Sequence, residues 1–483
     1  MASSVERFGF QSCVTIVRFT ATIGFSVLLL TSFGCGRRGL GLFSGNLLLI
    51  VELENVSYLH LDNSSEPIDS STGSLYALGD INKDGYTDFV ISARRPWGSG
   101  GGDRGWVAAY SGKEGTVLWQ MVGKNDADAR ADGEESGYHL KEIFLVGDLN
   151  NDGIPDIYCR DAYYKRTVFL LSGQDGSRIG RFPVEVTPGM LVRHPLCSHD
   201  VNGDGADDFL FSIFSDPGPT IQILSGTDLK PMEKHSDFWP ETIAYCAQWV
   251  LPRFGDVNND GTDDHLLRRG LKQDLDDPVY TYEMAFVSGA DFSVIRSFES
   301  PRPRSRGQEH HATTGDLDRD GMADILMTAS TGEGPDTHSS FIRAFSGADG
   351  QIIWQLLGTQ FKAGQQTFLI NTKTGERTDL APDIEFKGPV LSLPDINSDS
   401  IRDVATVAIL PGTQRTRQGV LLFSGTDGVS LGTLELPASH WKLNHAMVLL
   451  ESVTNDGQPG VAVVASTDDK KTAICIFRLP QSG

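Results

Sequence analysis

Residues 79–91 read Gly79-Asp80-Ile81-Asn82-Lys83-Asp84-Gly85-Tyr86-Thr87-Asp88-Phe89-Val90-Ile91. The nine residues from Asp80 to Asp88 carry an acid or an amide at the first, third, fifth and ninth positions and a glycine at the sixth. A short apolar run follows directly. Apolar runs bounded by glycine and aspartate are typical of antiparallel strands joined by tight turns. The sequence therefore predicts an acidic loop between two strands.

The nine-residue pattern is repeated along the chain. It returns at residues 148–156, 200–208, 256–264 and 316–324, with Ser400 in place of the glycine at 395–403, and in a worn form at 452–460. An apolar strand ending in Ser-Gly follows six of these loops, at Ser111-Gly112, Ser172-Gly173, Ser225-Gly226, Ser288-Gly289, Ser346-Gly347 and Ser424-Gly425. Four-stranded units that recur in this way are typical of β-propellers. We therefore predict an all-β, seven-bladed β-propeller of four-stranded antiparallel blades.

The two ends of the chain suggest how the ring closes. The last repeat stops after its third strand, and the apolar segment 47–61 precedes the first repeat. We expect part of this segment to pair into the last blade and close the ring; the alternative is a linker. The predicted domains are a signal or lipoprotein anchor at 1–36, a linker with the ring-closing strand at 37–70, and the propeller at 71–483. The long spacing between the fifth and sixth loops predicts an inserted hairpin near residues 360–387.

The N-terminal segment has the features of an export signal. Arg7 and Arg18 precede an apolar stretch from Phe19 to Phe33, and small residues follow it. This order is typical of a signal peptide, and the stretch is short for a membrane span, which needs about 20 residues. Ser32-Phe33-Gly34-Cys35 resembles a bacterial lipobox with Cys35 as the lipidated residue. We predict an exported protein that is periplasmic, secreted or a lipoprotein at the outer membrane or cell surface; the alternative is an uncleaved anchor.

Charge and cysteine usage narrow the class further. The chain has 63 acidic and 41 basic residues and a formal charge of −22, which argues against a nucleic-acid-binding protein. The cysteines form no Cys-x-x-Cys pair. Disulfide bonds in an oxidising compartment and burial as small apolar residues both remain open for Cys159, Cys197, Cys246 and Cys475.

Through these loops the chain resembles the FG-GAP/VCBS repeat family, which includes the propellers of integrin α-subunits. The resemblance covers residues 70 to 480. The Phe-Gly and Gly-Ala-Pro motifs of that family are not clearly present, so similarity to integrins is distant. The resemblance implies that each acidic loop joins the first two strands of a blade and binds one Ca²⁺.

The residue types support the same assignment. Calcium takes six to eight oxygen ligands, whereas zinc would call for His or Cys. Positions 1, 3, 5 and 9 offer side-chain oxygens, position 7 offers a backbone carbonyl, and glycine at position 6 allows a sharp turn. The predicted ligands are Asp80, Asn82, Asp84, Tyr86, Asp88; Asp148, Asn150, Asp152, Ile154, Asp156; Asp200, Asn202, Asp204, Ala206, Asp208; Asp256, Asn258, Asp260, Thr262, Asp264; Asp316, Asp318, Asp320, Met322, Asp324; and Asp395, Asn397, Asp399, Ile401, Asp403.

We therefore expect five or six structural Ca²⁺ ions. In the worn seventh loop Ser452, Thr454 and Gly460 replace ligands, so we expect no metal there. The alternative for every loop is a metal-free hairpin held by Asx turns.

A partner surface is expected on the side of the ring away from these loops. Arginine and aromatic residues gather there in the sequence, at Arg94, Arg95, Trp97, Arg104, Tyr163, Tyr164, Arg166, Arg268, Arg269, Arg415 and Arg417. Arginine suits carboxylate, sulfate or phosphate groups, and aromatic residues are frequent at recognition surfaces. We predict a protein or anionic glycan as ligand of a monomeric propeller that associates with membranes only through its N-terminus. The alternative is a solvated surface with extended arginines.

We predict a binding or adhesion module and not an enzyme. No nucleophile elbow, zinc-protease helix or phosphate-binding loop is evident. Trp119 and Trp354 lie on strands that resemble those of quinoprotein propellers, but the adjacent cysteines usual in those enzymes are missing. Because a propeller can gather acids from several loops, the alternatives are a polysaccharide lyase or hydrolase and a quinoprotein-like oxidoreductase.

Overall fold

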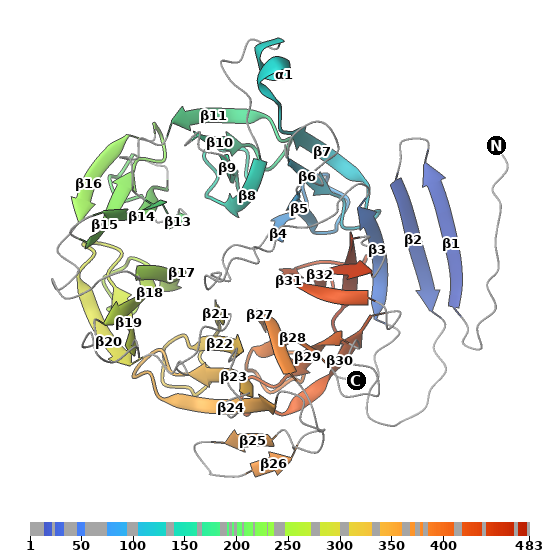
Figure 1. The fold of residues 1–483 in the computed structure, drawn as a ribbon. Coiled ribbons are helices and arrows are strands. Elements are labelled where there is room, and N and C mark those ends of the chain that lie inside the picture. Colours follow the sequence, from blue (N-terminus) through green and yellow to red (C-terminus); the bar gives the residue numbers. More distant parts are fainter. Residues whose placement is uncertain are drawn as a thin grey trace.

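The computed structural model is described here over the following residues: 14–21, 25–32, 46–53, 75–93, 105–131, 140–161, 167–183, 191–192, 196–197, 200–204, 207–215, 218–228, 230–235, 247–271, 281–299, 309–330, 339–359, 368–371, 377–379, 385–409, 418–436, 441–467 and 472–480. Their strands form sheets arranged radially around a ring, as Figure 1 shows. Neighbouring strands within each sheet run antiparallel, as the short turns between apolar runs predict.

Six sheets are blades, each built from one continuous stretch of chain. The first blade contains β4 (Leu75–Gly79), β5 (Asp88–Ala93), β6 (Trp106–Tyr110) and β7 (Val117–Val122), and the second contains β8 (Leu140–Leu145), β9 (Ile157–Asp161), β10 (Thr167–Leu171) and β11 (Arg178–Pro183). The third contains β12 (Leu191–Val192), β13 (Leu196–Cys197), β14 (Phe209–Ser215), β15 (Gly218–Leu224) and β16 (Pro231–His235).

The remaining blades follow in chain order. The fourth contains β17 (Ala247–Gly255), β18 (Asp264–Leu271), β19 (Thr281–Val287) and β20 (Val294–Glu299). The fifth contains β21 (Glu309–Thr313), β22 (Ile325–Ser330), β23 (Ser339–Phe345), β24 (Ile352–Thr359), β25 (Phe368–Asn371) and β26 (Arg377–Asp379). The sixth contains β27 (Glu385–Leu393), β28 (Asp403–Ile409), β29 (Gln418–Phe423) and β30 (Ser430–Glu435).

A further sheet, here called the closing sheet, combines both ends of the chain. Its strand order is β1-β2-β3-β33-β32-β31. The bounds are β1 (Val14–Ala21), β2 (Phe25–Ser32), β3 (Leu47–Leu53), β31 (Trp441–Leu450), β32 (Gly460–Thr467) and β33 (Thr472–Arg478). β3 pairs antiparallel with β33, with Ile50 opposite Cys475 and Val51 opposite Ile474. This is the segment for which the sequence indicated a ring-closing role.

The prediction of a seven-bladed propeller of four-stranded blades is wrong: the propeller has six blades. Six blades arise from continuous repeats, and the worn seventh repeat does not make a blade of its own, because it supplies only three strands of the six-stranded closing sheet. Four sheets contain four strands, whereas the third blade has five and the fifth has six. The number of acidic loops in the sequence therefore does not equal the number of blades. The expected insertion near 360–387 is confirmed as the paired strands β25 and β26, which lie outside the ring in Figure 1.

The hydrophobic core is divided among the seams between neighbouring sheets, because each sheet has apolar residues on both faces. Phe286 of the fourth blade and Phe345 of the fifth belong to one cluster and are fully buried. Val51 and Leu49 of the closing sheet join a cluster with Phe89 of the first blade. Ring closure by β3 thus buries apolar area as well as pairing a strand edge.

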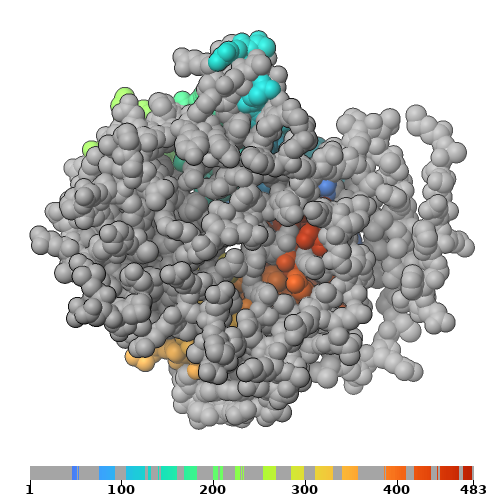
Figure 2. Space-filling model, in the orientation of Figure 1, coloured from blue at the N-terminus to red at the C-terminus, as the bar shows by residue number. Residues whose placement is uncertain are grey.

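The N-terminal strands and a short helix lie at the outside of the ring. β2 pairs with both β1 and β3, so these strands extend the closing sheet outward. Helix α1 (Asp126–Ala131) projects from the rim, in cyan at the top of Figures 1 and 2. Among the described residues, no helix combines the length and apolarity needed to span a membrane. Export and lipidation stay predictions, and Cys35 falls outside the described residues.

Candidate metal centres

In the first, second, fourth, fifth and sixth blades the acidic loop connects the first strand of the sheet to the second, as the resemblance implied. The third loop lies between β13 and β14, and the seventh between β31 and β32. The loop from Asp80 to Asp88 joins β4 to β5, and the loop from Asp316 to Asp324 joins β21 to β22. The ninth-position aspartates of the first six loops have no exposed surface; they are Asp88, Asp156, Asp208, Asp264, Asp324 and Asp403. Buried carboxylates are costly unless they are hydrogen-bonded or paired with a cation. The partners of these six groups therefore define the site.

The first-position aspartate holds the turn of the loop. In the first loop the Asp84 N–H donates to Asp80 Oδ1 at 2.9 Å and the Gly85 N–H donates to Asp80 Oδ2 at 2.8 Å. The fifth loop repeats both bonds at 3.0 and 2.8 Å, with Asp316 as the acceptor. The chain thus wraps around one carboxylate in an Asx-type turn. This arrangement brings the ends of the nine-residue pattern close together.

The ninth-position aspartate connects the loop to the rest of its blade. In the fifth loop Asp324 Oδ2 accepts from the Leu317 N–H at 2.6 Å, and Asp324 Oδ1 accepts from the Gly347 N–H at 3.0 Å. Gly347 belongs to the Ser-Gly turn after β23. The Gly112, Gly173, Gly226, Gly289 and Gly425 N–H groups donate in the same way to the ninth-position aspartates of their own blades.

The Ser-Gly turn is therefore a second half of each site, a role that the sequence had not indicated. Its serine hydroxyl donates to the fifth-position aspartate, for example from Ser346 to Asp320 Oδ2 at 3.0 Å. Glycine is required beside it, because a Cβ at Gly347 would lie 1.9 Å from the Ala323 carbonyl oxygen. The recurrence of Ser-Gly at a similar distance after every intact loop was the signal that could have revealed this pairing.

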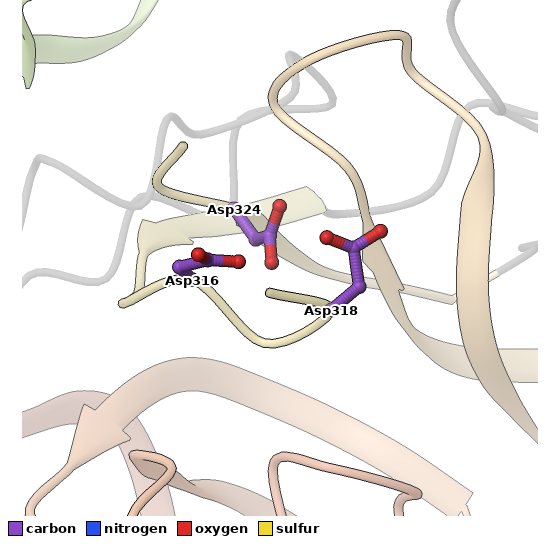
Figure 3. A group of neighbouring side chains, drawn as sticks. All are labelled: Asp316, Asp318 and Asp324. Carbon is purple, nitrogen blue, oxygen red and sulfur yellow. The ribbon is translucent and has the colours of Figure 1, made fainter. Parts of the chain in front are cut away.

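In the fifth loop the carboxylates converge. One oxygen each from Asp316, Asp318 and Asp324 lies within 4.8 Å of the others, and Figure 3 shows the three side chains around one shared space. Within the described parts of the chain this is the one group of three such ligands. The reason is Asp318, since the other intact loops have asparagine at this position.

Asparagine at the third position has a different role. In the fourth loop Asn258 Nδ2 donates to Asp260 Oδ2 at 2.8 Å, while Asn258 Oδ1 accepts from the Asp260 N–H at 2.9 Å. The amide thus neutralises part of the repulsion around the fifth-position carboxylate. Asp318 replaces this amide donor with a carboxylate, so the fifth loop holds one more acidic side chain next to Asp320 than the loops with asparagine do.

The predicted ligand set is brought together only in part. Positions 1, 3 and 9 meet in the fifth loop, whereas Asp320 at position 5 is turned toward the Ser346 hydroxyl and the Met322 N–H. The carbonyl ligands at position 7 stay predictions. Ala206 in the third loop falls outside the described residues, as does Gly205 beside it.

Burial shifts the acid–base behaviour of these loops. Burial raises the pKa of Asp324 to about 7, and the nearby Asp318 and Asp320 carboxylates add to the rise. The Gly347 and Leu317 N–H groups oppose it. Burial also raises the pKa values of Asp88, Asp156 and Asp403 to about 6. A cation among these groups would stabilise their charged forms.

The sixth and seventh loops depart from the pattern in different ways. Ser400 adopts the left-handed conformation of the glycine that it replaces, with φ of 69°, and its N–H still donates to Asp395 Oδ2 at 2.8 Å. In the seventh loop Ser452 instead contacts the first loop: its Oγ donates to the Gly85 carbonyl at 2.8 Å and its N–H donates to Thr87 Oγ1 at 2.9 Å. The worn loop thus serves the junction between the closing sheet and the first blade.

The arginine and aromatic residues predicted as a ligand surface lie almost wholly outside the described residues. Arg94, Arg95, Trp97, Arg104, Tyr163, Tyr164, Arg166, Arg415 and Arg417 are in this group. Arg268 and Arg269 are placed only by their backbone in β18, opposite Gln248 and Ala247. Cys246 also falls outside, whereas Cys159 and Cys475 are buried.

The two quinoprotein-like tryptophans lie between blades. Trp119 on β7 and Trp354 on β24 are buried, and each donates its indole N–H to a Ser-Gly glycine of the next blade. Both side chains therefore pack and hydrogen-bond between neighbouring blades.

Comparisons with known proteins leave the activity open. No protein-family model matches the chain, so the resemblance to FG-GAP/VCBS repeats rests on the acidic loops alone. A T-cell immunomodulatory protein homolog from Plasmodium falciparum (isolate 3D7) is 22% identical over 317 residues, which are 53% of this chain and 43% of that protein. The match therefore spans less than half the length of this relative.

Several solved structures match the chain with TM-scores below 0.5. The Dos1 propeller matches with a TM-score of 0.39 at 9% identity, over 89% of this chain and 97% of that one. A europium-containing methanol dehydrogenase matches with a TM-score of 0.40 at 9% identity, over 86% and 95%. BBS1N, in its complex with ARL6DN soaked with lead, matches with a TM-score of 0.32 at 12% identity, over 71% and 92%.

Proposed function

We propose that this chain is a calcium-stabilised β-propeller that acts as a binding module outside the cytoplasm. The proposal that the chain binds calcium is based on the convergence of Asp316, Asp318 and Asp324 in the fifth loop. All three offer carboxylate oxygens, which are the ligands that calcium prefers, and neither His nor Cys is among them. Asp324 is fully buried, so its negative charge gains most from a bound cation.

The other intact loops fit the same ion with fewer charges. They keep the first-position turn and the buried ninth-position carboxylate, and their asparagine offers a neutral oxygen. Calcium affinity depends on the number of charged ligands and on the rigidity of the site. We therefore propose that the fifth loop binds calcium most tightly, that the other intact loops bind it more weakly, and that the seventh binds none.

The role of such ions would be structural. Each loop is hydrogen-bonded to the Ser-Gly turn of its own blade, so an ion that orders the loop also orders the start of the fourth strand. Without a cation the carboxylates repel one another and oppose the turn. Binding to the folded state alone raises stability by mass action.

The ligand of the module is proposed to be an anionic glycan or an acidic protein surface. Its site would be on the side of the ring opposite the acidic loops, where Arg94, Arg95, Arg104 and Trp97 follow the first blade's second strand in sequence. Arginine forks bind sulfate and carboxylate groups through paired hydrogen bonds. Retention on heparin that is lost on exchange of Arg94 and Arg95 for glutamine would support this proposal, whereas retention that is unaffected by the exchange would refute it.

Thermal unfolding of the full chain with excess EGTA and then with calcium tests the metal proposal. A midpoint that rises with calcium supports it, and equal midpoints in both buffers would rule it out. Two variants locate the effect. Asp318→Asn installs the residue of the other loops and should weaken the calcium response while leaving the EGTA midpoint equal or higher. Asp456→Asn, in the seventh loop, is the matched control and should leave the calcium response unchanged.

A further inference from the structure

A hydrogen bond links the outer strand of one blade to the Ser-Gly turn of the next at three seams. The donor is always the eighth residue after the serine of its own Ser-Gly turn: Trp119, Arg296 and Trp354. The acceptor is the carbonyl oxygen of the Ser-Gly glycine in the following blade. Arg296 therefore occupies a tryptophan position and performs the same task with a charged group.

Arg296 bridges the fourth and fifth blades. It lies on β20 opposite Phe286, with its guanidinium 4.9 Å from the Phe286 ring centroid. Its Nη1 donates to the Ala348 carbonyl at 2.5 Å, and its Nη2 donates to the Gly347 carbonyl. The same Nη2 lies 3.5 Å from Met322 Sδ in the fifth acidic loop. The side chain thus reaches from its own blade to the loop that gathers three carboxylates.

The surroundings of Arg296 are acidic. Burial lowers the pKa of its guanidinium, while the carboxylates of Asp320, Asp349 and Asp264 act in the opposite direction. Arginine keeps its charge in proteins, so these acids face a permanent cation. Trp119 and Trp354, by contrast, bring no charge to the loops that follow them.

Two departures from the repeat coincide at this seam. The fifth loop has Asp318 where its neighbours have asparagine, and the blade before it has Arg296 where two others have tryptophan. Arg296 therefore contacts, through Met322, the same loop that carries the additional carboxylate, and Asp320 of that loop acts on its guanidinium. Gly347 connects them, because its carbonyl accepts from Arg296 and its N–H donates to Asp324.

We propose that Arg296 is an internal counter-ion of the fifth acidic loop, which keeps the seam between the fourth and fifth blades closed when the loop holds no calcium. This inference rests on the proposed function for the identity of the cation. When calcium binds, it takes over the neutralisation of the acids, and the charge of Arg296 then matters less. Arg296 is thus a positioning residue that acts through Gly347 and Asp320.

The test compares Arg296→Trp and Arg296→Gln with the wild-type chain. Arg296→Trp installs the residue of the other seams, and Arg296→Gln keeps an N–H donor without the charge. Hydrogen exchange of a peptide covering residues 345–350 reports opening of the seam. In EGTA we expect both variants to exchange about tenfold faster there than wild type, and in saturating calcium we expect most of that difference to disappear. If wild type responds to calcium, equal acceleration in both buffers would overturn the proposal, because Arg296 would then act by packing alone.

Two controls separate this inference from the metal proposal. Arg319→Gln removes a positive charge from the exposed tip of the same loop and should leave exchange at 345–350 unchanged. The second control measures the same exchange in EGTA with and without 1 M NaCl, so it does not depend on calcium binding. The Debye length at 1 M salt is about 3 Å, so the exchange difference between Arg296→Gln and wild type should shrink. If this exchange difference shrinks in salt while exchange of the wild type does not respond to calcium, the counter-ion role of Arg296 is supported and the calcium proposal is refuted. If the exchange difference does not depend on salt, the counter-ion role is refuted.

Discussion

The indole N–H of Trp354 donates a hydrogen bond of 2.7 Å to the carbonyl oxygen of Gly425, which joins β24 of the fifth blade to the turn after β29 of the sixth. Gly425 in turn donates its own N–H to Asp403 at 3.2 Å. Trp119, Gly173 and Asp156 repeat this chain of contacts between the first and second blades. The seams of the ring and the acidic loops therefore belong to one hydrogen-bonded network.

Replacing Trp354 by phenylalanine should destabilise the seam, because phenylalanine keeps an aromatic ring but has no N–H donor. The exchange leaves the buried Gly425 carbonyl without a donor, which costs about 1–3 kcal/mol of unfolding free energy. Trp119→Phe should behave alike, because its bond to Gly173 is equivalent. Urea denaturation measures both. Ile179→Val on the exposed side of β11 is the control and should change stability by less than about 0.5 kcal/mol. Equal stability of Trp354→Phe and wild type would show that the bond is not needed.

The sixth loop should gain stability from Ser400→Gly. Ser400 has φ of 69°, a conformation that costs a side-chain-bearing residue about 1 kcal/mol relative to glycine. Gly321 has the equivalent position in the fifth loop with φ of 94° and open space around an added Cβ. Gly321→Ser should therefore cost what Ser400→Gly gains. Both values come from urea denaturation in EGTA, and a loss of stability in Ser400→Gly would contradict the strain argument.

Metal-free stability should fall as pH rises. Burial raises the pKa of Asp324 to about 7 and those of Asp88, Asp156 and Asp403 to about 6, above the value near 4 of an unfolded carboxyl. Folding therefore favours the protonated forms, and this contribution is lost between about pH 4 and pH 7. Calcium binds the charged forms, so the stability gained from calcium should grow over the same interval.

Urea denaturation at pH 5.5, 6.5 and 7.5, with EGTA and with calcium, checks both trends. A metal-free chain that gains stability across this range would show that the buried carboxylates are not the groups that govern it.

The acidic loops were predictable because all of their candidate ligands lie within nine consecutive residues. Spacing alone placed Asp316, Asp318 and Asp324 in one loop and the loop between two strands, and the structure agrees. The bond from Ser346 to Asp320 was not predictable in this way, because it joins residues 26 positions apart across two strands. The position of Asp320, turned toward Ser346 rather than into the group of three, follows from that bond.

The form of the ring was harder to predict than its units. Repeats in a sequence suggest equal blades, yet strand pairing also depends on segments that carry no motif. β3 completes the closing sheet through apolar residues such as Ile50 and Val51, which form no repeat. The fifth blade gains β25 and β26 from an insertion whose length was visible but whose pairing was not. The role of Arg296 was hidden for the same reason, since its partners lie in another blade.

Metal counting on the purified full chain, after dialysis against calcium and removal of free ions, shows directly whether the acidic loops bind calcium. We expect five or six calcium ions per chain by elemental mass spectrometry. We also expect the loss of one ion in Asp316→Ala, where the turn and one ligand of the fifth loop are removed, and no loss in Asp456→Asn. A chain that retains no calcium would contradict the proposed metal sites and leave the acidic loops as hydrogen-bonded turns.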